Sequence, residues 1–276
     1  MWDTPLAKAC PMTASHHFLL GLANMELKQP AAAAEQFRQC LSKRARPALS
    51  PINPEILGAG PNHLLALALA AQKQNDAAAA AFREALVDDP KSSPARLDFA
   101  RFQFERGDAL EALKLLNELV AENPQDALVW QFGGQIILSR PEFLEFGRDW
   151  TAEAIKNHPQ DSAIISQRAE VLLLSQDAPA ALPLWSSEAI PASPRQLAAV
   201  IICEAVAGKW QRRIPAADEA RVSQEMLKWC RTLIAMRAND VIGTLTANLE
   251  KLREVVPSFV GFWEAASKEA SQVAIA

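Results

Sequence analysis

The side chains most able to do chemistry in this chain are its histidines and cysteines, and their positions predict no shared site. His16 and His17 are adjacent, and neighbours on a helix point about 100° apart, so the two rings would not face one metal ion. His63 and His158 lie far along the chain from them. The cysteines have no paired spacing that would predict a zinc motif or a disulfide framework. We expect reduced thiols that pack as small hydrophobic side chains at Cys10, Cys40, Cys203 and Cys230.

Short motifs of common enzyme classes are also absent from the sequence. It contains no glycine-rich phosphate loop, no Gly-x-Ser-x-Gly elbow and no His-Glu-x-x-His. The one glycine pair, Gly133-Gly134, is predicted to lie inside a helix as a packing contact. Two short basic clusters are interpreted as solvated helix or loop ends, with an acidic partner segment as the alternative; they are Lys43, Arg44 and Arg46, and Lys209, Arg212 and Arg213. We therefore expect no catalytic residue, no metal and no cofactor.

Composition favours an all-α protein with a large core. Half of the 276 residues are apolar, glycine is sparse at 10, and tyrosine is absent. The formal charge of -4 gives no positive field for a phosphate backbone, so we expect no nucleic acid partner. No run approaches the roughly 18 apolar residues that span a bilayer, and the N-terminus does not read as a secretory signal. A cytoplasmic protein with no membrane insertion, bacterial in the style of its alanine-rich segments, is the expectation.

A recurring pattern of small residues organises the first two thirds of the chain. The first phase has steps of 45, 34, 34 and 35 residues and consists of Gly21, Ala66, Ala100, Gly134 and Ala169. The second phase has steps of 45, 34, 35 and 34 residues and consists of Ala33, Ala78, Ala112, Gly147 and Ala181. The two phases predict paired antiparallel helices that approach closely where the side chains are small.

Prolines and turn residues divide this pattern into units. A proline follows the second helix of each later unit, at Pro90, Pro124, Pro159 and Pro194. We predict an N-terminal extension at 1–12, repeats at 13–45, 59–92, 93–126, 127–161 and 162–193, and a proline-rich insertion at 46–58. The insertion is either a surface excursion or part of a binding surface. Residues 194–276 are predicted to form helices near 194–207, 217–236, 238–255 and 257–272 that cap the last repeat.

These spacings resemble the tetratricopeptide repeat family, whose unit of 34 residues carries small and large apolar residues at set phases. The match is best at 59–92, with Leu65-Ala66, Ala78, Phe82 and Pro90, and at 127–160, with Trp130, Gly134, Ala154 and Pro159. The chain departs from the family in lacking the aromatic three residues after the first small residue. The resemblance implies a right-handed α-solenoid of about five helix-turn-helix repeats whose first helices line a concave groove.

Carrying the groove positions of the family onto this chain gives a candidate peptide-binding site. The positions are Phe18, Leu22, Met25, His63, Leu67, Ala70, Leu97, Arg101, Phe104, Glu105, Gln131, Gln135, Leu138, Ser166, Glu170 and Leu173. The first repeats supply apolar residues and the later ones polar residues, which suits an amphipathic helix or an extended peptide. The Lys and Asn pattern by which chaperone-binding members clamp a C-terminal carboxylate is absent.

The resulting hypothesis is a non-enzymatic scaffold or adaptor that binds a segment of another protein. The alternative is an accessory or regulatory repeat module of a glycosyltransferase or methyltransferase system, a role that rests on association alone. A third hypothesis is self-association through an exposed aromatic patch of the C-terminal helices, made of Trp229, Phe259, Phe262 and Trp263.

Overall fold

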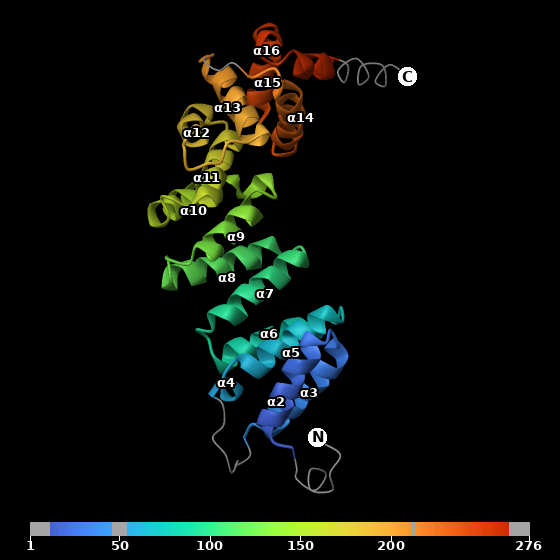
Figure 1. The fold of residues 1–276 in the computed structure, drawn as a ribbon. Helices are drawn as coiled ribbons and strands as arrows, with labels where there is room; N and C mark the ends of the chain where they lie inside the picture. The colour runs from blue at the N-terminus through green and yellow to red at the C-terminus, as the bar shows by residue number, and fades with distance from the viewer. Residues whose placement is uncertain (1–11, 46–53, 211–213, 265–276) are drawn as a thin grey trace. The chain divides into compact units, whose positions relative to one another are not determined.

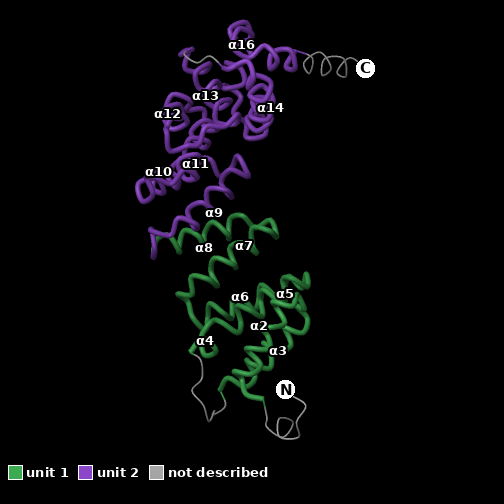
Figure 2. The backbone as a smooth tube through the Cα atoms, in the orientation of Figure 1, with its two compact units in different colours: residues 1–121 green, residues 122–276 purple. Residues whose placement is uncertain are grey.

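The computed structural model describes residues 12–45, 54–210 and 214–264, and all regular secondary structure in these ranges is helical (Figure 1). The predicted all-α class is confirmed. Within the described residues, no helix is both long and apolar enough to cross a membrane. The chain divides into two compact units, residues 1–121 and residues 122–276 (Figure 2).

Unit 1 consists of helical hairpins. Its helices are α2 (Ala14–Glu26), α3 (Pro30–Lys43), α4 (Pro54–Leu57), α5 (Gly60–Ala71), α6 (Asn75–Asp88), α7 (Ser93–Glu105) and α8 (Ala109–Glu122). The pairs α2–α3, α5–α6 and α7–α8 fall in the repeats predicted at 13–45, 59–92 and 93–126. Of the proline-rich insertion, residues 46–53 lie outside the described residues, and Pro54–Leu57 forms one helical turn.

Unit 2 begins with two more hairpins and continues into further helices. Its elements are α9 (Ala127–Ile137), the 3-10 helix η1 (Pro141–Phe143), α10 (Leu144–Asn157), α11 (Ser162–Leu174), α12 (Ala178–Trp185), α13 (Pro194–Ala207), α14 (Glu219–Ala235), α15 (Asn239–Ala247) and α16 (Leu249–Val255), followed by helical residues at 257–264. The pairs α9–α10 and α11–α12 fall in the repeats predicted at 127–161 and 162–193.

The small residues of both phases are buried in every hairpin, as predicted. At Gly21 an added Cβ would collide with the ring of Phe37 in the paired helix α3, and at Gly147 it would collide with Ile137 of α9. Gly133 stands against the indole of Trp150, and Gly134 against the side chain of Gln167. The glycine pair is therefore a packing contact, because a larger side chain would push the helices apart.

Four of the five turns between paired helices share one geometry, and the α9–α10 turn differs because it has no residue with positive φ and runs through η1. A residue in the left-handed region ends the first helix at Lys28, Lys73, Gly107 and Gln176, with φ between 56° and 91°. The next residue donates its N–H to the carbonyl five residues back, as Gln29 does to Asn24 (2.8 Å) and Asp108 to Gln103 (2.9 Å). This closure satisfies carbonyls that a helix end leaves unpaired.

The same turn recurs in the region that the sequence presented as non-repeating. Arg237 has φ 61° between α14 and α15, and Ala238 donates to the carbonyl of Leu233 (2.8 Å). Helix α13 packs against α12, α14 and α15. Residues 144–260 contribute to one hydrophobic core, so the predicted cap boundary at 194 lies inside this core.

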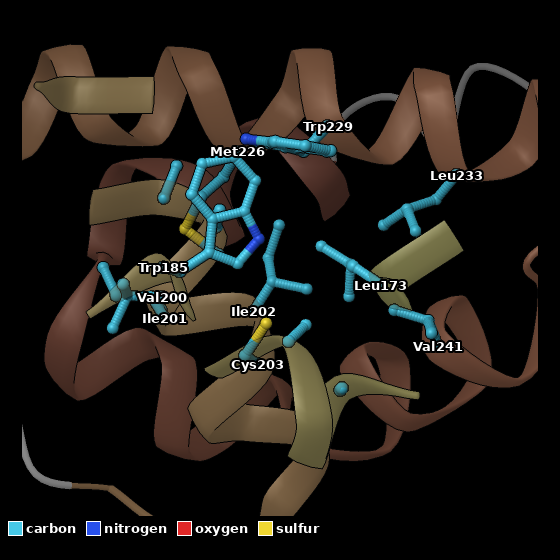
Figure 3. Close-up of a cluster of buried hydrophobic side chains, with 14 of the residues drawn as sticks. Leu173, Trp185, Val200, Ile201, Ile202, Cys203, Met226, Trp229, Leu233 and Val241 are labelled. Atoms are coloured by element: carbon cyan, nitrogen blue, oxygen red, sulfur yellow. The ribbon is translucent and has the colours of Figure 1, made fainter. Parts of the chain in front are cut away.

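Two expectations for the C-terminal region are wrong. The predicted helix 238–255 is broken at Asn248, whose side chain donates to the carbonyl of Thr244 (2.8 Å) and so competes with the backbone ladder. The exposed aromatic patch does not form, because Trp229 and Phe259 are fully buried. Trp229 lies edge-on to Trp185, in the core drawn in Figure 3. Of the four aromatics, Phe262 is exposed and Trp263 is half-buried.

We predict that Gly133→Ala lowers the free energy of unfolding of unit 2 by about 1–3 kcal/mol, because the added methyl overlaps the Trp150 indole. The matched control is Gly243→Ala in α15, where an added Cβ meets no atom within 4 Å. That change should raise stability by up to about 1 kcal/mol through helix propensity. Urea unfolding followed by tryptophan fluorescence measures both, since six of the seven tryptophans lie beyond residue 121. Equal effects of the two substitutions would refute the packing role.

Candidate functional site

We define the first-helix face as the surface of the first helix of each hairpin that carries the predicted groove positions. In unit 1 these positions lie on α2, α5 and α7, and in unit 2 on α9 and α11. Phe18 does not belong to this face. Its side chain is 2% exposed and packs edge-on against Phe37, with 6.1 Å between the ring centroids. Phe18 is therefore a core residue that holds α2 to α3, and its assignment to the groove is corrected.

A polar cluster on unit 1 joins α5 to α7. His63 Nε2 donates to Asp98 Oδ2 (2.9 Å), and Arg101 Nη1 donates to Asp98 Oδ1 (3.2 Å). The hydrogen bond from His63 lowers the pKa of Asp98 below its ordinary value, and desolvation opposes this while the Arg101 charge supports it. The side chain of Arg101 is 51% exposed, so its guanidinium remains accessible beside the buried end of the cluster.

Apolar side chains occupy other predicted groove positions on the first helices of unit 1. Leu22 and Met25 on α2, Leu67 on α5 and Phe104 on α7 are all half-buried, and Glu105 is exposed. Half-buried leucine and methionine side chains keep apolar surface in contact with solvent, which a partner's side chains could cover. Unit 1 thus carries both apolar and charged side chains at the candidate positions.

On unit 2 the polar positions are linked from one hairpin to the next. Gln131 Nε2 on α9 donates to Asp161 Oδ2 at the start of α11 (2.9 Å). Gln167 Nε2 on α11 donates back to the carbonyl of Gln131 (2.8 Å). Gln135, one turn further along α9, is exposed. The hydrogen bonds fix Gln131 in place, so Gln135 is the more accessible amide of this part of the face.

Glu170 on α11 is held by Arg195 of α13. Arg195 Nη2 lies 3.0 Å from Glu170 Oε1 and 3.1 Å from Oε2. The guanidinium also stacks over the Trp229 ring at 4.4 Å, and Trp229 Nε1 donates to the Arg195 carbonyl (3.2 Å). Burial raises the pKa of Glu170, although Arg195 opposes this effect. Leu173, one turn beyond, points into the core and is not part of the face (Figure 3).

Sequence reasoning missed the partners of these residues. Asp98, Asp161 and Arg195 each contact a predicted position from another hairpin, at separations of 35, 30 and 25 residues. Asp161 carries a visible signal, because it also caps α11 by accepting from Ala163 N (2.9 Å) and Ile164 N (3.0 Å). Asp98 and Arg195 carry no such local signal.

The first basic cluster is partly used for internal contacts. Arg44 makes two hydrogen bonds to Asp88 (2.7 and 2.9 Å), and Asn62 Nδ2 donates to the same carboxylate (2.7 Å). Desolvation disfavours ionised Asp88, but these hydrogen bonds outweigh it and lower its pKa. Lys43 donates to His17 Nε2 (2.7 Å). Arg46, Arg212 and Arg213 lie outside the described residues, and Lys209 is exposed.

The histidines and cysteines of the described chain are separate from one another. His17 is buried, with Nδ1 donating to Gln36 Oε1 (2.7 Å), so both its nitrogens are engaged. Burial raises the pKa of Cys40 to about 11 and of Cys203 and Cys230 to about 12, as expected for packed thiols. Cys10 lies outside the described residues. In the part of the chain that the structure covers, no three His, Cys, Asp or Glu side chains gather as metal ligands.

Successive helical hairpins joined by short turns define an α-solenoid. Residues 69–136 match the model of the tetratricopeptide repeat family, which confirms the resemblance seen in the sequence. Residues 69–136 are therefore of the tetratricopeptide repeat type, and proteins with such repeats are generally scaffolds for protein–protein interaction. A comparison with curated protein sequences found no significant match.

Solved structures of bacterial proteins share the fold at low sequence identity. A tetratricopeptide repeat protein from Parabacteroides merdae is 14% identical with a TM-score of 0.56, and the match covers 88% of this chain and 93% of that one. PilF from Pseudomonas aeruginosa is 14% identical with a TM-score of 0.50, covering 92% and 97%. MamA from Desulfovibrio magneticus is 17% identical with a TM-score of 0.50, covering 63% and 91%. These identities support a shared fold and nothing further.

Asp98 and Glu170 should have opposite effects on the pH dependence of stability. The pKa of Asp98 is lower in the folded protein than its ordinary value. Its contribution to the free energy of unfolding is therefore present above the ordinary pKa and is lost as the pH falls toward the folded pKa. The pKa of folded Glu170 is raised, so its contribution declines as the pH rises from the ordinary pKa toward the folded value. Asp98→Asn should remove the loss of stability at low pH that Asp98 causes. Glu170→Gln should remove the decline in stability with rising pH that Glu170 causes.

Urea unfolding at steps from about pH 2.5 to about pH 7 measures both slopes. Circular dichroism follows the helices of both units and tryptophan fluorescence follows mainly unit 2, so a slope seen only by circular dichroism belongs to unit 1. Each variant serves as the control for the other, because the carboxyls lie in different units. A result in which both substitutions flatten the same slope would contradict the assigned contacts.

Proposed function

We propose that this chain is a non-enzymatic scaffold that binds a peptide or helical segment of another protein on its first-helix face. The observation that carries the proposal is on unit 1, where exposed Arg101 and half-buried Phe104 lie one turn apart on α7 and half-buried Leu67 lies on α5. A peptide can gain from covering these apolar side chains, while the charged groups fix its orientation and register. The match of residues 69–136 to the tetratricopeptide repeat family supports the same class of function.

The internal hydrogen bonds refine which residues we expect a ligand to contact. Asp98 shields His63, and Asp161 engages Gln131, so these predicted residues act mainly by positioning the face. Arg101 and Glu105 on unit 1 and Gln135 on unit 2 are exposed. On unit 1 we expect a ligand to make polar contacts with Arg101 and Glu105 and apolar contacts with Leu22, Met25, Leu67 and Phe104. On unit 2 we expect Gln135 to supply the direct polar contact. The remaining half-buried positions, Ala70, Leu97, Leu138 and Ser166, would border them.

A peptide library displayed on phage and selected against the intact protein tests this proposal. Selected peptides should lose binding about tenfold or more, equivalent to about 1.4 kcal/mol, when Arg101→Glu reverses the charge on α7. Gln135→Ala tests the face of unit 2 in the same way. Isothermal titration calorimetry measures the affinities, and circular dichroism verifies unchanged helical content.

The matched control is Arg83→Glu, a charge reversal at an exposed arginine on the second helix α6. It should leave peptide affinity within about twofold, since its side chain is outside the first-helix face. The proposal fails if selected peptides tolerate both face substitutions, or if Arg83→Glu weakens them as much as Arg101→Glu does.

A further inference from the structure

The solvent side of α14 carries a row of basic side chains. Arg221, Lys228 and Arg231 are all exposed. Their spacings of seven and three residues place them along one side of the helix, over about 15 Å. The helix cannot turn this side inward, because its other side holds Trp229 and Leu233 in the core (Figure 3).

Two apolar side chains lie beside the basic row. Leu227 is half-buried, and Ile234, seven residues further on, is 56% exposed. Both neighbour Arg231 on the helix surface, since Leu227 precedes it by four residues and Ile234 follows it by three. Together these five residues form an amphipathic surface that we call the α14 face: Arg221, Leu227, Lys228, Arg231 and Ile234.

The two arginines of the α14 face have no partner in the part of the chain that the structure describes. Most described arginines are held by another group, and Arg44, Arg148 and Arg195 each bind a carboxylate from another segment. Arg221 and Arg231 make no hydrogen bond or ion pair with a described residue. Their guanidinium donors are therefore available to an anion from outside the chain.

The carboxylates of α14 leave this positive charge uncompensated. Glu225 pairs with Lys228, with 2.6 Å between Oε1 and Nζ. Glu219 instead accepts from Ser258 N (3.0 Å), Ser258 Oγ (2.7 Å) and Ser223 Oγ (2.9 Å), so it is engaged in holding the last described helix. The α14 face thus has three cations against one carboxylate, in a chain whose formal net charge is -4.

We propose that the α14 face binds an acidic amphipathic helical segment of another protein. Apolar side chains of that segment cover Leu227 and Ile234, and carboxylates on its flank pair with Arg221 and Arg231. Charge complementarity favours this partner, because an uncharged segment would bring the two guanidinium groups into an interface with no anion to receive them. The α14 face is separate from the first-helix face, so this binding is additional to the function proposed above.

Two other kinds of anionic partner match the α14 face less well. The phosphate backbone of a nucleic acid supplies anions but no apolar group to cover Ile234, and the negative charge of the chain opposes its approach. A helix that lies on an anionic membrane needs a broad apolar side. On α14 that side is buried in the core, and only Leu227 and Ile234 remain beside the cations.

A phage-displayed library of helical peptides, selected on the full chain, tests the proposal. Each peptide carries leucine at every seventh position, and the positions that flank the leucine row vary among glutamate, glutamine and lysine. Selection on the wild-type chain should enrich glutamate on a flank. Fluorescence anisotropy of the labelled peptides should then show an affinity that falls about tenfold or more with Arg231→Glu, because the substitution replaces an attraction with a repulsion.

A charge swap tests the complementarity directly. The chain that carries both Arg221→Glu and Arg231→Glu should select lysine-flanked peptides in place of glutamate-flanked ones. Arg83→Glu is the matched control, since Arg83 is an exposed arginine of α6 that also lacks a partner among the described residues, and it should leave affinity within about twofold. Arg101→Glu should leave these peptides equally unaffected, because it changes the first-helix face alone.

Several results would overturn the proposal while circular dichroism shows unchanged helical content. These are a selection that does not enrich glutamate, peptides that bind the doubly substituted chain as tightly as the wild type, or a doubly substituted chain that does not favour lysine. Peptides weakened by Arg101→Glu and not by Arg231→Glu would support the first-helix face and contradict the α14 face. Phosphatidylserine vesicles or duplex DNA that bind through Arg231 when no peptide is selected would assign the face to phosphates instead.

Discussion

The close approach of paired helices is the constraint on which the rest of this structure depends. In each repeat one helix supplies a glycine or alanine, and a large side chain of the other fills the space, as Phe37 does against Gly21 and Trp150 against Gly133. A packed interior tolerates little extra volume, so neither partner can grow without displacing a helix. The left-handed turn of four of the five repeats follows from the same geometry, since it reverses the chain within a few residues and returns the second helix to the first.

Much of the architecture could be predicted from the sequence because the small residues recur at a nearly constant step. Apart from α4, which lies in the predicted insertion, the helices α2 to α12 fall within the predicted repeat ranges, and α13 spans the predicted residues 194–207. The continuation of hairpin geometry at Arg237 could not be predicted, because its turn uses an ordinary arginine and its neighbours lack the alanine pattern. The break at Asn248 depends on one side-chain hydrogen bond, which periodicity does not detect.

Burial was harder to predict than helix position. Periodicity tells which residues share one side of a helix and does not tell which neighbour covers that side. Phe18 and Trp229 were assigned to surfaces and lie in cores, whereas Leu19 and Leu27 received no role and are exposed. The polar contacts of the first-helix face could not be predicted for the same reason. His63 meets Asp98, and Glu170 meets Arg195, only once separate hairpins stack, so the sequence indicated one member of each pair.

The most direct measurement of the central claim compares two leucine substitutions one turn or less apart on α6. Ala78 is a buried member of the small-residue pattern, and Ala80 is exposed on the same helix. The close-approach account predicts that Ala78→Leu lowers the free energy of unfolding by about 1–3 kcal/mol, while Ala80→Leu changes it by no more than about 0.5 kcal/mol. Equal tolerance of leucine at both positions, measured by urea unfolding, would contradict it.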